Sequence, residues 1–325
     1  MSETGSHTSL RHPKASSHSR LWRTGVTALA PAKVNLDLRV IGRRDDGYHE
    51  LRSRFLAVSL FDTLEVRTGG QGIELSVHGG SHDVPTDASN LVVRAVDSIR
   101  QAFERSHSVG DVRIRLTKRI PSQAGLGGGS SDAVSAAHAV CRLWGIRTDR
   151  PEVAEAVNSL GSDLAFFHAG WPLAECRGRG EIVNPVRDGA EGFYVLAKPD
   201  FGLPSGDVFR HFGQCEASEN IRTSRFRGDH AVRGGQKSVL NDLQEAACSL
   251  DVRYARWLQR LEGVPSSDVT GGWTMSGSGT TAFSRVPTWT SGRRLATTVR
   301  GQLGCWCQVV APVAARLWSV HLLDN

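Results

Sequence analysis

Near the middle of the chain lies the run Pro121-Ser122-Gln123-Ala124-Gly125-Leu126-Gly127-Gly128-Gly129-Ser130-Ser131-Asp132. A strand is predicted before it, because Val112, Ile114 and Leu116 alternate with polar residues, and a helix is predicted to begin near Ser131. Glycine lets backbone N–H groups approach an anion without a Cβ atom in the way. The start of a helix adds unpaired N–H groups and the positive end of the helix dipole. The run is therefore predicted to be a loop that binds phosphate groups.

The residues that close this loop also fit a simpler role. Ser130, Ser131 or Asp132 could cap the helix behind a flexible connection. Four glycines within Gly125–Gly129 favour phosphate binding, because a plain connection does not need them. Either serine could hydrogen-bond phosphate oxygens, or one hydroxyl could help to hold Mg²⁺. The run has neither the Gly-Lys-Ser/Thr of a P-loop nor a dinucleotide-type Gly-x-Gly-x-x-Gly, so a positive charge must come from elsewhere in the chain.

The composition is that of an ordinary globular protein. Of the 325 residues, 39% are hydrophobic and 22% are charged, which excludes a disordered or fibrous chain. The apolar runs are far too short to span a membrane, and the N-terminal segment lacks the apolar stretch of a secretory signal. A cytoplasmic location is therefore expected. The net charge of +6 suits an anionic ligand without specifying one.

The basic segments and the six cysteines do not have the patterns typical of a nucleic-acid-binding surface or a metal site. The N-terminal segment and Arg222–Arg233 are basic, but neither has the interleaved aromatic residues of a nucleic-acid-binding surface. A solvated tail and loop are expected there, and neither nucleic acid nor membrane is a predicted partner. The cysteines form no Cys-x-x-Cys pair and no metal-site spacing. Reduced, mostly buried thiols are expected.

The pattern of predicted elements favours an α+β fold. Residues 1–24 are polar and aperiodic and are expected to be a disordered extension. Val34–Val40 alternates between apolar and polar residues, which predicts a half-buried strand. Strands and helices do not alternate regularly, so a doubly wound parallel sheet is not expected. Further strands are predicted at 64–67, 73–77, 112–116, 193–197 and 281–284, and helices at 90–103, 133–145, 152–160, 239–247, 254–261 and 293–302.

Five motifs, in order and spacing, resemble those of the GHMP kinases, a family that includes galactokinase, homoserine kinase, mevalonate kinase and phosphomevalonate kinase. The glycine run resembles the central motif of the family. The other four motifs are Ala30–Leu36, Gly42–Leu51, Leu160–Asp163 with Phe166-Phe167 soon after, and Ser276–Gly279. The triple glycine followed by two serines is most similar to the branch that phosphorylates the 2-hydroxyl of 4-diphosphocytidyl-2-C-methyl-D-erythritol, and the resemblance covers residues from about 28 to 285.

The resemblance implies a fold, a reaction and its ligands. It implies an N-terminal domain similar to ribosomal protein S5 domain 2 over residues 25–187, and a ferredoxin-like α/β-sandwich C-terminal domain over residues 188–325, with the boundary near Asn184–Gly192. The expected enzyme is a monomer or homodimer that uses ATP with Mg²⁺ to phosphorylate a small cytidine diphosphate-linked methylerythritol. Another GHMP kinase acting on a different alcohol, or a catalytically silent nucleotide-binding relative, remains an alternative. The metal ligands are not predicted.

Lys33 and Asp163 are the expected catalytic pair. Phosphoryl transfer needs a group that takes or orients the proton of the attacking alcohol, and cations that neutralise developing charge. Asp163 follows Gly161-Ser162 at a predicted helix start, so capping of that helix is the alternative role. A solvated strand lysine is the alternative for Lys33. The resemblance favours catalysis for both, with Lys33 keeping the aspartate ionised and stabilising the substrate alkoxide.

The same resemblance implies which residues hold the two substrates. Pro121–Ser131 would bind the ATP phosphates, and Asn90 either lines the adenine pocket or caps the helix that follows it. The expected acceptor-binding residues are Asn35, Tyr48, His49, Phe209, Gly277, Ser278 and Gly279. Tyr48 would stack on the cytosine while His49 supplies hydrogen bonds. Such stacking of a base on an aromatic ring contributes about 1–3 kcal/mol per base. Because mevalonate and homoserine have no ring to stack, this pair selects the cytidyl substrate, unless it is only a surface dipeptide.

Three departures from the family pattern concern the pocket more than the activity. Thr280-Thr281 follows the late glycine-rich motif where smaller, more apolar residues are expected. Leu164-Ala165 stands in place of the usual Val-Pro after the aspartate. The segment Cys215–Lys237 matches poorly. None of these changes removes a predicted catalytic group.

Overall fold

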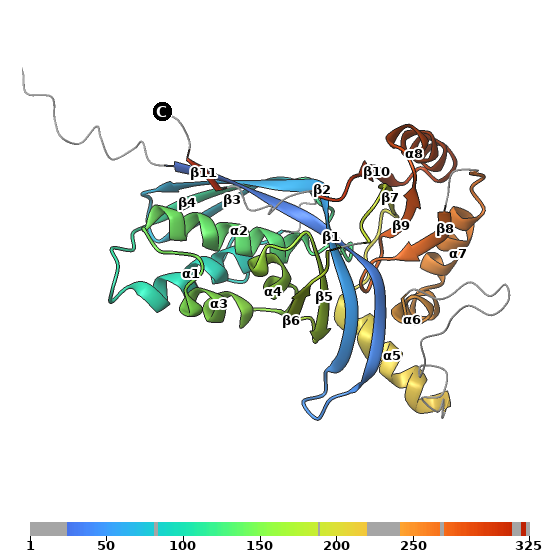
Figure 1. Cartoon of the computed structure of the whole chain (residues 1–325), viewed down its shortest axis with the longest axis horizontal. Helices are drawn as coiled ribbons and strands as arrows, with labels where there is room; N and C mark the ends of the chain where they lie inside the picture. The colour runs from blue at the N-terminus through green and yellow to red at the C-terminus, as the bar shows by residue number, and fades with distance from the viewer. Residues whose placement is uncertain are drawn as a thin grey trace, which may run out of the picture.

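The computed structural model describes residues 25–80, 84–187, 189–219, 241–266, 270–313 and 320–322. The predicted N-terminal extension and the basic segment Arg222–Arg233 lie outside these residues. Two sheets lie side by side, each covered by its own helices (Figure 1). Among the described residues, no helix combines the length and apolar character needed to cross a membrane.

The first sheet has seven strands and is covered by four helices. Its strands are β1 (Gly25–Arg43), β2 (His49–Thr68), β3 (Ile73–Gly79), β4 (Val112–Lys118), β5 (Leu173–Gly178), β6 (Ile182–Pro185) and β11 (Val320–Leu322). Its helices are α1 (Leu91–Phe103), α2 (Gly128–Leu143), α3 (Pro151–Asn158) and α4 (Ser162–Ala169). The strand order is β11-β1-β2-β4-β3, and β5 joins β2 on one side and β6 on the other.

The second sheet is antiparallel and has the order β10-β7-β9-β8. Its strands are β7 (Phe193–Lys198), β8 (Thr270–Met275), β9 (Ala282–Val286) and β10 (Trp306–Val310). Its helices are α5 (Ser205–Glu219), α6 (Leu243–Leu250), α7 (Val252–Glu262) and α8 (Trp289–Leu303). The element order strand, helices, two strands, helix, strand is that of a ferredoxin-like unit. The expected two-domain α+β architecture is confirmed.

The chain passes from one sheet to the other close to the predicted boundary. The last strand before the passage ends at Pro185, and the first strand of the second sheet begins at Phe193. One element departs from the range 188–325: β11, near the end of the chain, pairs with β1 of the first sheet, with Val26 opposite Leu322. The first sheet therefore contains strands from both the beginning and the end of the described chain.

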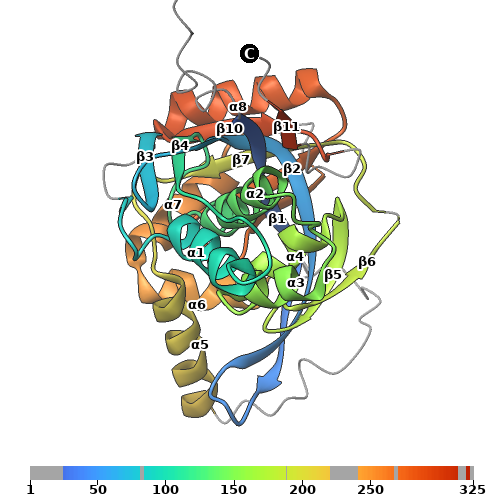
Figure 2. The ribbon, with the colours of Figure 1, turned by 90° about the vertical axis from the view of Figure 1, so that its left-hand side faces the viewer.

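A hairpin of two long strands, β1 and β2, links the two halves. Both views show its free end and α5 extending from the body in the same direction (Figures 1 and 2). The expectation of a half-buried strand at 34–40 is wrong over its first part, because Lys33 and Asn35 are as buried as Val34. The second sheet lies close to this part of β1, and Ser276, beside the end of β8, contacts Asn35. The central part of β1 is thus buried on both faces.

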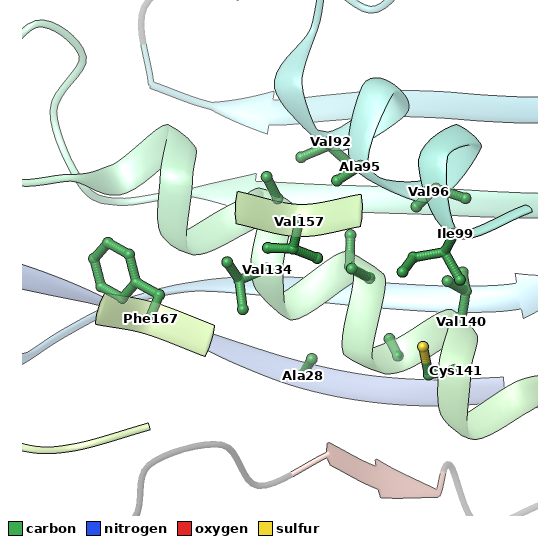
Figure 3. Close-up of a cluster of buried hydrophobic side chains, with 14 of the residues drawn as sticks. Ala28, Val92, Ala95, Val96, Ile99, Val134, Val140, Cys141, Val157 and Phe167 are labelled. Carbon is green, nitrogen blue, oxygen red and sulfur yellow. The ribbon is translucent and has the colours of Figure 1, made fainter. Parts of the chain in front are cut away.

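Helix α1 shows how the sequence builds the core of the first half. Its apolar residues recur at helical spacing, and the buried ones are Val92, Ala95, Val96, Ile99 and Phe103. Figure 3 shows Val92, Ala95, Val96 and Ile99 meeting residues of α2, α3, α4 and β1 in one cluster, to which Phe103 also belongs. A further buried cluster spans the junction, where side chains of β1, β2 and the glycine run pack against β7, β9 and β10. Apolar packing therefore joins the halves around the glycine run.

Two histidines pair inside the first half and should make the fold sensitive to acid. His138 of α2 and His168 of α4 are hydrogen-bonded (Nε2 to Nδ1, 3.0 Å), and burial lowers the pKa of His138 to about 3 and lowers the pKa of His168 as well. Below pH 6.5 the unfolded chain takes up protons that the folded chain does not. Stability should fall as pH drops from 6.5 towards 3, by up to about 1.4 kcal/mol per pH unit from His138, and His168 should act in the same direction.

Urea unfolding at pH 7 and pH 5 measures this effect. The difference in unfolding free energy between the two pH values should be smaller in His138→Leu than in the wild type. The exposed His78, changed to Gln, is the matched control and should leave the difference unaltered. An equal difference in all three proteins would contradict the assignment.

Candidate active site

The glycine run forms a loop and the first turn of α2. The helix begins at Gly128 rather than near Ser131 as expected, and Gly127 is its N-cap with φ +67°. Glycine has low helix propensity, which is why the sequence predicted a later start. The N–H groups of this first turn have no partner within the helix. They remain available to an anion, as the phosphate-binding interpretation requires.

Contacts with strand β1 and with the second half of the chain fix the loop. The Lys33 N–H on β1 donates to the Leu126 carbonyl (2.9 Å), and Ser276 Oγ donates to the Gly125 carbonyl (2.9 Å). Gly125 has φ +70°, and a Cβ atom there would lie 2.1 Å from the Ser276 carbonyl oxygen. Only glycine fits at this close approach.

Two cavities meet at the loop. The large cavity has a volume of about 1080 Å³ and is lined by Lys33 and Asp163 together with the end of the β1–β2 hairpin and α5. The loop cavity has a volume of about 390 Å³ and is lined by the glycine run, Asn90 and Lys118. The residues that line both are Leu91, Gln123, Gly125, Gly127 and Ser130. This arrangement allows two ligands to meet at the loop.

Lys33 and Asp163 face each other in the large cavity. Lys33 Nζ lies 3.3 Å from Asp163 Oδ2, and the aspartate side chain is 27% exposed whereas the lysine is 4% exposed. Gly161, not Asp163, is the N-cap of α4, so the capping alternative for Asp163 is wrong. The positive end of the α4 dipole adds to the stabilisation of the carboxylate. The acidic group that the cavity can reach is thus held against a buried cation.

Two irregularities in β1 flank Lys33. The pairing of β1 with β2 shifts between Pro31 and Ala32 and again between Asn35 and Asp37. Such bulges bend a strand and redirect its side chains. Between them, Lys33 Nζ donates to Asn35 Oδ1 (2.7 Å) and lies 4.4 Å from the centre of the Phe55 ring. The solvated-lysine alternative is therefore wrong, because this ammonium is buried and held in place.

Asn35 connects the lysine to the glycine-rich turn of the second half. Its Nδ2 donates to Ser53 Oγ (2.8 Å), and its backbone N–H donates to Ser276 Oγ (3.2 Å). The turn that contains Ser276 is itself fixed by Asn241, whose Nδ2 donates to the carbonyls of Met275 and Gly277 (2.7 and 2.8 Å). Asn35 thus orients the lysine, and Gly277, Ser278 and Gly279 line the cavity beside it.

The far part of the large cavity, at the hairpin end, is aromatic. Tyr48 is 57% exposed there. The His49 ring stacks on Phe209 of α5 (centroids 5.7 Å apart) and meets Phe212 edge-on. Burial and the charge of Arg43 lower the pKa of His49, so its ring is neutral at pH 7 and has one donor and one acceptor nitrogen. Its Nε2 is buried without a hydrogen-bond partner in the structure.

Beneath the loop lies a buried ionic cluster that the sequence did not reveal. Lys118 Nζ bonds to Asp62 and, at 2.7 Å, to Asp132 Oδ2. Burial opposes the charge on Lys118, but Asp132 and Asp62 outweigh it and raise its pKa, while burial raises the pKa of Asp132 well above its usual range. Lys118 also lines the loop cavity, but its charge is already paired with the carboxyl groups of Asp62 and Asp132.

The structure brings nearly all of the predicted site residues to the two cavities. Pro121–Ser130 and Asn90 line the loop cavity, and the predicted acceptor residues line the large one. Ser131 is the exception: it is fully buried and lines neither. Asn90 caps α1, accepting from the Val92 N–H (2.8 Å), so the capping alternative is confirmed. A role for Asn90 towards adenine stays a prediction.

Known proteins match both the sequence and this geometry. Residues 90–170 match the family model described as the GHMP kinases N terminal domain. A "4-diphosphocytidyl-2-C-methyl-D-erythritol kinase" from Polaromonas sp. (strain JS666) is 38% identical over 79% of this chain and 82% of its own length. One from Kineococcus radiotolerans is 37% identical over 83% and 84%. The chain belongs to the GHMP kinase family.

Solved structures show the same fold. A crystal structure of 4-(cytidine 5′-diphospho)-2C-methyl-D-erythritol kinase superposes with a TM-score of 0.68 and 32% identity, covering 88% of this chain and 99% of that one. A homoserine kinase from Cytophaga hutchinsonii, at 16% identity and a TM-score of 0.62, shows the shared fold alone.

Proposed function

We propose that this GHMP kinase transfers the γ-phosphoryl group of ATP to the 2-hydroxyl of 4-diphosphocytidyl-2-C-methyl-D-erythritol. The observation that supports this acceptor is that the large cavity has the Lys33–Asp163 pair in one part and Tyr48, His49 and Phe209 in another. An elongated acceptor could place an alcohol at the ion pair and a base against the aromatic rings. The neutral His49, with its unpartnered buried nitrogen, suits hydrogen bonding to the base.

The chain's own groups account for the transfer. Asp163 accepts or orients the proton of the attacking hydroxyl, and Lys33, fixed by Asn35, stabilises the oxygen as charge develops. The free N–H groups of the first turn of α2 bind the ATP phosphates. Ser130, which lines both cavities, stands where the two substrates would meet. Burial raises the pKa of the neighbouring Cys176 thiol to about 12, so that thiol is not a competing nucleophile.

Mg²⁺ fits the oxygen donors near the loop. The Ser130 hydroxyl and the Asp163 carboxylate both line the large cavity, and Mg²⁺ prefers such hard oxygen ligands together with phosphate oxygens. When bound, the ion neutralises charge on the phosphates of the nucleotide. Ser131, which sequence reasoning also considered for this role, is buried away from both cavities.

ATP consumption by the purified protein tests the proposal. The acceptors compared are 4-diphosphocytidyl-2-C-methyl-D-erythritol, mevalonate, homoserine and galactose. Turnover with the cytidyl compound alone is expected, and turnover with mevalonate alone would overturn the proposed acceptor. Absence of turnover with every acceptor, alongside intact ATP binding, would favour a silent nucleotide-binding relative, a role that the retained Lys33–Asp163 pair opposes.

Tyr48→Ala should weaken acceptor binding with little effect on ATP. If Tyr48 stacks on the base, its loss should raise the Michaelis constant for the cytidyl substrate by about 5- to 100-fold. The constant for ATP should stay within about twofold, because Tyr48 does not line the loop cavity. Trp289, a similarly exposed aromatic residue outside both cavities, gives the matched control Trp289→Ala. Equal losses for acceptor and ATP would contradict the stacking role.

A further inference from the structure

Arginines near the hairpin end fall into two groups. Most are paired with carboxylates: Arg44 with Asp46 and Glu50, and Arg52 and Arg177 with Glu175. Of the three arginines that line the large cavity, Arg210 is also paired, with Asp207 (2.8 Å). The other two, Arg43 and Arg179, have no carboxylate partner among the described residues. The cavity therefore has two uncompensated cations.

Both of these cations lie beside the aromatic residues rather than beside Lys33 and Asp163. The Arg179 guanidinium carbon is 4.9 Å from the centre of the Tyr48 ring. Arg43 lies directly opposite His49 in the pairing of β1 with β2. Neither arginine lines the loop cavity, where the nucleotide phosphates are expected. The excess positive charge therefore belongs to the acceptor end of the site.

Arg179 lies in a hydrogen-bonded turn between β5 and β6. Gly178 and Gly180 have φ values of +74° and +123°, and the Arg179 N–H donates to Glu181 Oε2 (2.5 Å). Glu181 thus accepts from the backbone of this arginine rather than from its guanidinium. The Gly178 N–H donates to Glu50 Oε1 (3.2 Å), which ties the turn to β2. The turn places the guanidinium of Arg179 over the Tyr48 ring, without a carboxylate partner among the described residues.

We propose that Arg179, together with Arg43, binds the diphosphate of the acceptor and so selects a nucleoside diphosphate over the bare nucleoside. This inference rests on the proposed function, which places a cytosine against Tyr48 and His49. The diphosphate follows directly on the cytidine, so it falls next to the two cations. A guanidinium offers a fork of N–H donors that matches phosphate oxygens, and such charge-assisted bonds are the stronger kind. Arg43 and Arg179 are specificity-determining residues in this proposal, and the phosphoryl transfer itself does not use them.

Calorimetric titration of the full chain with CDP and with cytidine tests the proposal without any turnover. Wild type should bind CDP more tightly than cytidine. Arg179→Gln should lose about 10- to 100-fold in CDP affinity while its cytidine affinity changes by less than about threefold. Arg43→Gln should act in the same direction, and Arg179→Lys should recover part of the loss because it keeps the charge.

The matched control is Arg177→Gln, two residues before Arg179 and paired with Glu175 outside the cavity. It should leave both affinities unchanged, and the Michaelis constant for ATP should be the same in all variants. Two results would overturn the role of Arg179 and leave the proposed acceptor standing. One is an equal loss of affinity for CDP and cytidine in Arg179→Gln, and the other is a loss of CDP affinity in Arg177→Gln as large as that in Arg179→Gln. A wild-type protein that binds neither ligand would overturn the proposed acceptor, and this inference with it.

Discussion

Replacing Asp163 by asparagine should lower kcat by about 10²- to 10⁴-fold, the usual contribution of a positioned acid or base. Asparagine keeps the shape of the side chain but cannot take the hydroxyl proton, and it removes the charge that lies 3.3 Å from Lys33 Nζ. The Michaelis constants for ATP and for the acceptor should change only a few-fold, because the aromatic end of the cavity and the loop are untouched. Steady-state kinetics measures all three values.

Two further variants show whether this loss is catalytic. The first is the control Asp207→Asn. Asp207 also lies in the first turn of a helix, α5, but it pairs with Arg210 and not with Lys33, so this change should keep kcat within about twofold. Lys33→Met should reproduce a large loss in kcat, because Asp163 then has no cation beside it. A near-normal kcat in Asp163→Asn, with the substitution verified by mass, would refute the mechanism.

Gly125→Ala should be the most damaging single-methyl change for folding. Alanine at φ +70° costs about 1–2 kcal/mol before any contact is counted. The new Cβ atom would also lie 2.1 Å from the Ser276 carbonyl oxygen, so the loop or the glycine-rich turn of the second half must move. We expect a thermal unfolding midpoint lower by several degrees, together with weakened binding of both substrates.

Gly129→Ala on the same loop separates folding from binding. Gly129 is in the first turn of α2, and a Cβ atom there would meet nothing within 4 Å. Its unfolding midpoint should equal or slightly exceed that of the wild type, because alanine favours the helix, while a methyl group in the loop cavity should raise the Michaelis constant for ATP. If both glycine variants unfold at the wild-type temperature, the close approach at Gly125 does not constrain the fold.

Local patterns allowed the sequence to predict much of the site. The glycine run, the predicted helix start before Asp163 and the Tyr48-His49 dipeptide after a turn are each readable within a few residues of chain. The structure brings these segments around adjoining cavities, which no local pattern could show. The resemblance to a family supplied the link between them, and the roles of individual residues remain predictions.

The features that sequence reasoning missed depend on distant partners. Lys118 meets Asp62 and Asp132 only because β4 lies beside β2 and the chain returns through α2. A lone aspartate between the apolar residues Phe61 and Leu64 was the one signal for this cluster. The burial of Lys33 was missed for a similar reason: the covering residue Ser276 lies in the other half of the chain.

The short strands also escaped notice because their residues give weak signals. β8, with the sequence Thr270–Met275, contains two glycines, and β5 carries arginine and glutamate among its few residues. Such strands form because longer strands offer them hydrogen-bonding edges: β5 pairs along β2 from Leu51 to Leu56. Propensity counts for little where a neighbour supplies the pairing.

The pairing of β11 with β1 has a consequence for synthesis of the protein. Val26, near the start of the described chain, lies opposite Leu322, near its end. During translation the N-terminal half leaves the ribosome long before Val320–Leu322 has been made. Until then, the edge of β1 that pairs with β11 has backbone N–H and C=O groups without partners. The glycine run and Asp163 are already present at that stage, whereas Ser276, whose hydroxyl donates to the Gly125 carbonyl, is not. The nascent chain therefore contains the glycine run and Asp163 well before it can hold them in their final positions.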